Sequence, residues 1–198
     1  MEKILENKID ALKEIINIGT GHAATALSEF IHKRVTVKVP DISVALISKM
    51  PELMGGADLR IRGFYFTLTG DFTGGIFLYF PEETAEGLAN TILADMDEKG
   101  EEMKKSALME LSNITTNSYI NAIANMIDSK IYISVPFYSA DMLGAIIDFM
   151  LIEISQNADY ALLMETFIEI EGEKISGKFI FMPDIISFNK LFERLGIK

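Results

Sequence analysis

Two pairs of side chains in this sequence combine the residue types and the spacing that chemistry at a protein surface requires. Glu14 and Asn17 stand three residues apart in the run DALKEIIN, and Glu110 and Asn113 repeat that spacing in SALMELSN. On an α-helix such residues lie within about 60° of each other, so each pair places a carboxylate beside a carboxamide on one face. A carboxamide stays uncharged while it both donates and accepts hydrogen bonds, so it can orient a water molecule. We predict two solvent-facing Glu/Asn sites, one on each of two helices.

A third polar residue precedes each pair by about one helical turn: Asp10 in the first run and Ser106 in the second. The opposite face of both helices is apolar, which predicts that it points toward a core. A single E-x-x-N is weak evidence for a site, because exposed helices are rich in both residue types. Its recurrence is stronger evidence, although shared ancestry of two halves explains part of it. For Asp10 and Ser106 we expect either a supporting role or an ordinary surface position.

The two runs belong to an internal duplication. Pro40 matches Pro136 at the same offset of 96 residues as the two Glu/Asn pairs. Three further matches have an offset of 102 residues: Gly70 with Gly172, Gly75 with Gly177, and Pro81 with Pro183. We read the two prolines of the first match as scaffold residues that end a strand and fix φ. The pattern predicts two pseudo-twofold-related repeats, 1–96 and 97–198, fused into a single domain over 1–198.

Hydrophobic periodicity predicts long helices and short strands in the same order in both halves. The expected helices cover residues 3–33, 81–95, 101–129 and 183–195. The expected strands cover residues 35–39, 43–49, 59–69, 73–80, 131–135, 161–170 and 175–182. Residues 141–154 fit either a strand that runs into a helix or a helix throughout. This order predicts an α/β fold of the α+β type, with long helices packed on a mostly antiparallel β-sheet.

Two glycines within the first helical pattern leave two alternatives open. Gly19 and Gly21 each cost about 1 kcal/mol relative to alanine inside a helix, so the helix could break near residue 19. The apolar stripe keeps its phase across both, which favours an unbroken helix. Because Gly21 lies on the same face as Asn17, we expect its missing side chain to admit another backbone. Asn117 occupies the matching position in the second half and adds bulk or a hydrogen bond, so the sequence does not predict equal behaviour of the two sites.

Composition excludes several classes of function. The net charge of −11 argues against nucleic-acid binding, which requires a basic surface. The chain has no cysteine, so it has no disulfide, no thiol nucleophile and no cysteine-based metal site. No apolar run reaches the roughly 18 residues of a membrane span, and the N-terminus is too charged for a signal peptide. We expect a cytoplasmic protein without nucleic-acid or membrane partners.

The motifs of several common enzyme classes are also missing. The sequence contains no glycine-rich phosphate loop, no G-x-S-x-G motif and no Rossmann fingerprint. Its two histidines, His22 and His32, are ten residues apart and read as surface or boundary residues. Gly74 and Gly75 lie between β patterns, which indicates a strand bulge or a close backbone approach. We therefore expect no metal site and no cofactor bound by the chain itself.

The duplicated motif resembles the signature of a known family. The spacing D/S-x3-E-x2-N-x22-P occurs twice, as Asp10, Glu14, Asn17 and Pro40 and as Ser106, Glu110, Asn113 and Pro136. This spacing resembles the signature of the CheC/CheX/FliY family of chemotaxis phosphatases, and the similarity covers essentially the whole chain. Two complete motifs are typical of the CheC type, whereas CheX-type chains usually carry one functional motif. A FliY-type chain would continue into a flagellar-switch domain, which we do not expect because the sequence stops at Lys198.

The resemblance implies that the chain dephosphorylates the response regulator CheY, whose aspartyl phosphate is held with CheY's own Mg²⁺ and lysine. Little covalent chemistry is then left for the phosphatase, so positioning dominates. By this resemblance, Asn17 or Asn113 enters the CheY site and holds a water in line with phosphorus, while Glu14 or Glu110 pairs with the CheY lysine. Glutamate as a general base is the competing role, which we rank second because anionic charge beside phosphate is unfavourable.

A further partner is implied for the segment 141–154, DMLGAIIDFMLIEI. Core packing is the simplest interpretation of this apolar run. By resemblance, CheC-type proteins bind the receptor deamidase CheD through a helix in this region, and methionine-rich surfaces adapt well to partners. The residues expected at this contact are Asp141, Met142, Ile146, Phe149 and Met150.

Functions of different classes stay open at this stage. The first is an enzyme that hydrolyses CheY phosphate, with CheD as its expected regulator. The second is an interaction module that sequesters CheD or CheY without turnover. Intact Glu/Asn pairs in both halves favour the enzyme. A structural component of the flagellar switch is a third reading, disfavoured by the missing C-terminal switch domain.

Overall fold

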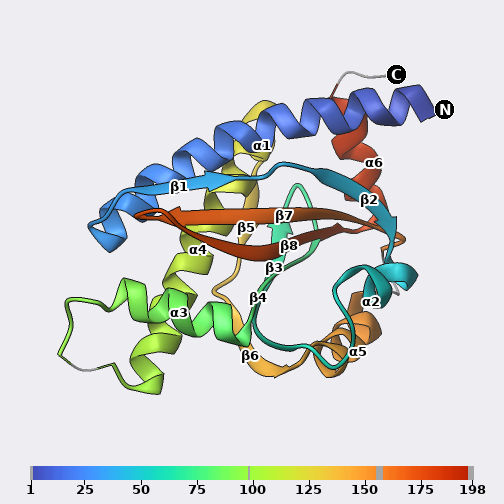
Figure 1. Ribbon diagram of the computed structural model, residues 1–198. Coiled ribbons are helices and arrows are strands. Elements are labelled where there is room, and N and C mark those ends of the chain that lie inside the picture. The colour runs from blue at the N-terminus through green and yellow to red at the C-terminus, as the bar shows by residue number, and fades with distance from the viewer. Residues whose placement is uncertain (1, 98, 155–157, 196–198) are drawn as a thin grey trace.

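The computed structural model describes residues 2–97, 99–154 and 158–195 (Figure 1). Its helices are α1 (Glu2–Ile31), α2 (Met50–Leu53), α3 (Glu82–Ile92), α4 (Glu101–Met126), α5 (Leu143–Ile154) and α6 (Ile185–Arg194), with a 3₁₀ turn at Ile47–Lys49. Its strands are β1 (Val35–Lys38), β2 (Ile42–Leu46), β3 (Arg60–Gly70), β4 (Gly74–Pro81), β5 (Ile131–Ile133), β6 (Phe137–Met142), β7 (Tyr160–Ile170) and β8 (Glu173–Pro183). Every predicted helix and strand is present, with shifts of a few residues at the ends.

One strand, β6, was largely absent from the sequence prediction. Only its last two residues fall in the segment 141–154, where a strand running into a helix was one of two alternatives. The structure confirms that alternative, because β6 ends at Met142 and α5 begins at Leu143. β6 is hard to predict from the sequence because none of its side chains is buried, so no alternation of buried and exposed positions marks it.

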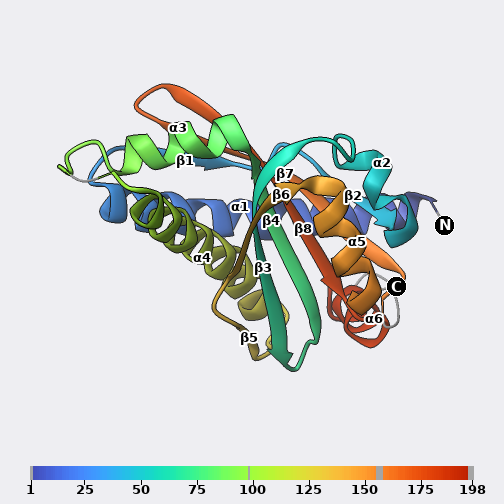
Figure 2. The same ribbon diagram turned by 90° about the horizontal axis from the view of Figure 1, so that it is seen from below.

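The strands form one eight-stranded sheet. Six of them follow the order β1-β7-β8-β4-β3-β5, β2 also pairs with β7, β6 also pairs with β3, and all pairings are antiparallel. Successive side chains of a strand point to opposite faces of a sheet. In β4, Ile76, Leu78 and Phe80 pack in the core that includes α1 and α4, while Phe77 and Tyr79 pack in a second core with α2 and α5. Helices therefore cover both faces of the central strands (Figure 2). The predicted fold class is confirmed.

The pairing scheme is unchanged when each element is exchanged with its counterpart in the other half. β4 and β8 pair at the centre of the sheet, β1 and β2 both pair with β7, and β5 and β6 both pair with β3. Each half thus supplies the short outer strands for the long hairpin of the other half. This topology supports a pseudo-twofold relation of two repeats, which stays a prediction.

Pro40 and Pro136 each lie in the gap between two short outer strands, where a residue that ends a strand is expected. Pro40 lies between β1 and β2, and Pro136 lies between β5 and β6. The flanking registers are Lys38↔Phe167 and Ile42↔Met164 in one half, and Ile133↔Leu68 and Phe137↔Tyr65 in the other. In both halves the proline-bearing segment has one residue more than its partner strand across this gap, as in a β-bulge. Proline fits this position because it has no N–H to donate to the ladder.

Helix α1 is continuous across both glycines, so the alternative of a break near residue 19 is wrong. The close backbone approach occurs at Gly19. A Cβ at Gly19 would lie 3.1 Å from the carbonyl oxygen of Ser118 and 3.1 Å from the Cα of Tyr119, both in α4. A Cβ at Gly21 would have no atom of the described residues within 4 Å. The expected approach is thus real, but we assigned it to the wrong glycine, because Gly19 lies on the buried stripe and Gly21 does not.

Candidate functional site

The first Glu/Asn pair lies on the exposed face of α1. Glu14 and Asn17 are both exposed, while Leu12, Ile15 and Ile16 on the opposite face are at most 2% exposed. The helix forms here because its apolar side chains recur with the period of an α-helix and pack in the core, which leaves the polar ones in solvent. The predicted placement of this pair is therefore confirmed. Asp10 is exposed on the same helix.

An ion pair joins this part of α1 to the segment that follows Pro40. Lys13 Nζ lies 3.0 Å from Asp41 Oδ1, and the hydrogen bond from Lys13 holds the pKa of the Asp41 carboxyl below its usual value. Lys13 directly precedes Glu14, and Asp41 directly follows Pro40, so the two ends of the sequence motif lie next to each other in space. The contact is exposed and adds little stability. It does pair the Lys13 ammonium group with Asp41 instead of with the neighbouring Glu14.

The second pair lies on α4, and its two side chains differ in exposure. Glu110 is exposed, whereas Asn113 is half-buried. Leu108 and Leu111 behind them are 4% and 0% exposed. Ser106 is exposed one turn before Glu110. The prediction that both members of the pair face solvent is thus confirmed for the glutamate and only in part for the asparagine.

A hydrogen bond explains why Asn113 is less free than its counterpart. Asn117 Nδ2 donates to Asn113 Oδ1 at 2.9 Å and to the backbone oxygen of Asn113 at 3.0 Å. The side chain of Asn17 has no hydrogen bond to any described residue, and its backbone oxygen accepts one from Thr20 Oγ1 at 2.8 Å. The spacing of four residues that brings Asn117 to Asn113 is visible in the sequence, but which atoms meet is not.

The helices that carry the two pairs pack directly against each other (Figure 1). Their contact at Gly19 lies two residues after Asn17, where the α1 backbone approaches α4. Both helices also contribute to one hydrophobic core on the same face of the sheet. The two sites therefore belong to a single helical layer of the molecule.

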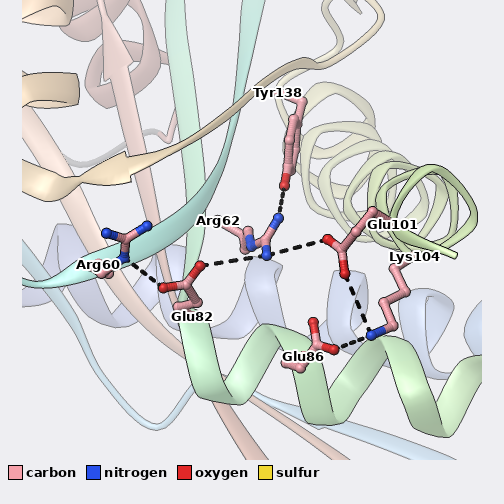
Figure 3. A network of polar contacts seen from close by, with 7 residues as sticks. All are labelled: Arg60, Arg62, Glu82, Glu86, Glu101, Lys104 and Tyr138. Atoms are coloured by element: carbon pink, nitrogen blue, oxygen red, sulfur yellow. Dashed lines mark hydrogen bonds and ion pairs between the residues drawn. The ribbon is translucent and has the colours of Figure 1, made fainter.

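A network of charged side chains that the sequence analysis missed anchors the first turns of α4 (Figure 3). Arg62 on β3 donates to the Tyr138 hydroxyl at 2.5 Å and lies 3.5 Å from Glu82 Oε1 and 3.6 Å from Glu101 Oε2. The hydrogen bond to Tyr138 raises the pKa of the Arg62 guanidinium. The remaining contacts of the network are Arg60 with Glu82, Lys104 with Glu86, and Lys104 with Glu101.

This network joins β3, β6, α3 and α4 immediately before the second site. Glu101 and Lys104 lie in the first turn of α4, and Ser106 follows two residues later. The acidic residues at the starts of α3 and α4, which include Glu82 and Glu101, were visible in the sequence. Their partner was not, because Arg62 lies in a strand some twenty to forty residues away along the chain.

The residues expected to bind a second partner divide between surface and core. Asp141 is exposed and Met142 is 47% exposed at the end of β6. Ile146 and Met150 are 9% and 8% exposed and pack in the core with α2, so core packing is the observed role of these two residues. The side chain of Phe149 lies outside the described residues.

An apolar hollow of about 570 Å³ opens beside this segment and is lined in part by Phe137, Tyr138, Asp141, Ile146 and Met150. Phe137 is itself 63% exposed. The surface beside Asp141 is therefore hollowed and largely apolar.

Two further observations concern binding sites and membranes. His22 and His32 are both exposed, and His32 has a φ of 57° directly after α1, as expected for boundary residues. Among the described residues, no group of three or more His, Cys, Asp or Glu side chains could hold a metal ion. Within the same residues, no helix is long and apolar enough to cross a membrane.

Comparison with known proteins places this arrangement in a family. Residues 8–44 match the CheC-like family, and residues 65–147 match the chemotaxis phosphatase CheX family. The chain is 34% identical to the CheY-P phosphatase CheC of Bacillus subtilis over 98% of its own length and 96% of that protein.

Solved structures share the fold. FliY of Thermotoga maritima superposes with a TM-score of 0.76 at 19% identity, and covers 96% of both chains. The FliM middle domain of Vibrio alginolyticus superposes with a TM-score of 0.68 at 10% identity, over 93% of this chain and 99% of that one. From its full-length similarity to a CheC protein, together with the motif spacing and this fold, the chain belongs to the CheC family.

Proposed function

We propose that this protein hydrolyses the aspartyl phosphate of CheY. The observation that carries the proposal is the exposed Glu14/Asn17 pair, set on a helix whose opposite face is locked into the core. A similar motif recurs in α4, and the B. subtilis relative at 34% identity is a CheY-P phosphatase. Rigid helices hold catalytic side chains more accurately than loops do.

In the proposed reaction the asparagine carboxamide holds a water molecule in line with the phosphorus of CheY-P. The water oxygen bonds to phosphorus as the bond between phosphorus and the aspartyl oxygen breaks, which releases inorganic phosphate and restores the CheY carboxylate. The Mg²⁺ ion and the lysine of CheY itself neutralise the charge on the phosphoryl group. An uncharged amide suits this task, because it orients water without repelling phosphate.

We assign the glutamates a docking role toward the CheY lysine. Glu14 and Glu110 are exposed, and neither forms an ion pair with any described residue, so both are available to a partner's cation. A general base is the weaker assignment, because an anion close to the phosphoryl group would repel it. The same reasoning makes Asp10 and Ser106 supporting residues at the rim of the contact.

The two sites make the proposed enzyme an internally duplicated one, and the exchange symmetry of the strand pairing supports this part of the proposal. The two sites would not be equivalent, because Asn113 is held by Asn117 and Asn17 has no such partner among the described residues. A cytoplasmic location follows from the proposed substrate, a response regulator.

The deciding experiment follows phosphate release from CheY-P with and without the protein. We expect the wild-type chain to accelerate release, and the double variant Asn17→Ala/Asn113→Ala to lose about 100-fold or more of that acceleration. Asn90→Ala, which removes an exposed asparagine from α3, is the matched control and should keep full activity. Normal turnover by the double variant would refute the mechanism. Binding of CheY-P without any acceleration would instead favour the sequestering module.

We also propose CheD as a partner at the surface around Asp141 and Met142. The exposure of Met142 and the adjacent apolar hollow support this assignment. Met142→Asp should weaken CheD binding about tenfold or more, because a charge would replace apolar contact. Met96→Asp is the control, since Met96 is 52% exposed between α3 and α4. Equal CheD affinity of both variants would remove this surface from the proposal.

A further inference from the structure

The second site contains an additional amide that contacts the proposed catalytic one. Asn117 lies one turn after Asn113 on α4, and its Nδ2 group donates to both the side-chain and the backbone oxygen of Asn113, at 2.9 and 3.0 Å. Both asparagines are half-buried. Two bonds from one amide to one residue restrict the side-chain rotation of both residues.

The first site lacks this contact. Gly21 occupies the position that corresponds to Asn117, and it is exposed with no described atom within 4 Å of a Cβ placed there. Asn17 is exposed, and its side chain makes no hydrogen bond to any described residue. The two sites thus carry the same Glu/Asn pair with different constraints on the asparagine.

We propose that Asn117 is a positioning residue that sets the orientation of the Asn113 carboxamide before CheY-P arrives; this rests on the proposed function. A carboxamide oxygen has two lone pairs. Asn117 occupies one of them, so Asn113 keeps its NH₂ group and its second lone pair for the attacking water. Accepting a hydrogen bond also polarises the amide, which makes its NH₂ group a better donor.

Pre-orientation of Asn113 should have a measurable effect on kcat/KM. Immobilising one side chain at an interface costs an amount that corresponds to roughly two- to tenfold in an equilibrium constant. Asn17 incurs this cost when it enters the CheY site, whereas Asn113 has incurred it during folding. We therefore expect the second site to have the larger kcat/KM by about that factor. The Asn17 side chain of the first site keeps more freedom to rotate than the Asn113 side chain of the second.

The test uses chains with one working site. In the Asn17→Ala background, Asn117→Ala should lower kcat/KM about two- to tenfold. Asn117→Asp should give no rescue, because a carboxylate has the same shape but accepts hydrogen bonds instead of donating them. In the Asn113→Ala background, Gly21→Asn should raise kcat/KM by a similar factor, while the matched control Gly21→Ala should not. Gly21 has the space for either side chain.

A second readout separates this inference from the proposed function. NMR relaxation of the side-chain NH₂ groups should show Asn113 more ordered than Asn17 in the wild type. Asn117→Ala should remove the difference while circular dichroism shows that the fold is kept. If the wild type does not act on CheY-P, the proposed function fails but the NMR result still decides the positioning role. Equal order of the two asparagines in the wild type would overturn the inference, and so would an unchanged kcat/KM for Asn117→Ala in an active chain.

Discussion

Substituting alanine for Gly19 tests how closely α1 and α4 pack. The new Cβ would lie 3.1 Å from Ser118 O, 3.1 Å from Tyr119 Cα and 3.2 Å from Ala122 Cβ. Two of these three atoms are backbone, so a side-chain rotation cannot relieve the contact and the helices must separate by a few tenths of an ångström.

The magnitude follows from two opposing terms. Overpacking a well-packed contact costs about 1–3 kcal/mol, and replacing glycine by alanine within a helix returns about 1 kcal/mol. Gly19→Ala should therefore lower the free energy of unfolding by up to about 2 kcal/mol. Gly21→Ala gains the same helix propensity without any clash, so it should raise the free energy of unfolding by up to about 1 kcal/mol.

Urea denaturation of the two variants and the wild type measures both effects. The two substitutions are chemically identical and lie two residues apart on one helix, so their opposite signs isolate the helix contact. In a domain of this size, each kcal/mol shifts Tm by about 2–4 °C. If Gly19→Ala were as stabilising as Gly21→Ala, the close approach of α1 and α4 at Gly19 would be refuted.

Three further predictions concern stability, each read by chemical denaturation. Asp184 caps α6 by accepting from the Ser187 N–H at 2.7 Å, so Asp184→Ala should cost about 1 kcal/mol. Burial opposes ionisation of Asp184, but hydrogen bonds from Thr73 and Ser187 outweigh it and lower its pKa. This contribution is present above the unfolded-state pKa and is lost as the pH falls through the folded-state pKa, so Asp184→Asn should reduce the loss of stability in acid below about pH 4. Tyr138→Phe should cost about 0.5–1.5 kcal/mol, because Arg62 then loses a hydrogen-bond acceptor. An unchanged free energy of unfolding for Asp184→Ala or Tyr138→Phe would contradict the corresponding contact, and an unchanged loss of stability in acid for Asp184→Asn would contradict the lowered pKa of Asp184.

The Arg62 network links the second site to the rest of the fold. It ties the start of α4 to β3 and α3, and the glutamate and asparagine of the second site follow on the same helix. Weakening the network is therefore expected to loosen the helix that carries the second site before it affects α1. The first site has no described contact to this network, and its nearest ion pair is the exposed Lys13–Asp41 contact beside Pro40.

Local spacing along the chain was enough to predict the helical faces and most of the strands. Glu14 and Asn17 could be placed together because three residues along a helix always return to nearly the same face, whatever packs behind them. The two prolines could be read as strand ends because proline lacks an N–H wherever it stands. The recurrence of the motif was visible for the same reason, since it is a property of the order of residues alone.

Only the tertiary structure decided which residues meet across the fold. It showed that Gly19, not Gly21, admits another backbone, because the neighbour is α4, some hundred residues away in sequence. It also revealed β6, which borders β3 and is recognisable by its backbone pairing rather than by its side chains. Strand order and the Arg62 network depend on the same long-range contacts. Side-chain periodicity records which face of an element is buried, but not the element that covers it.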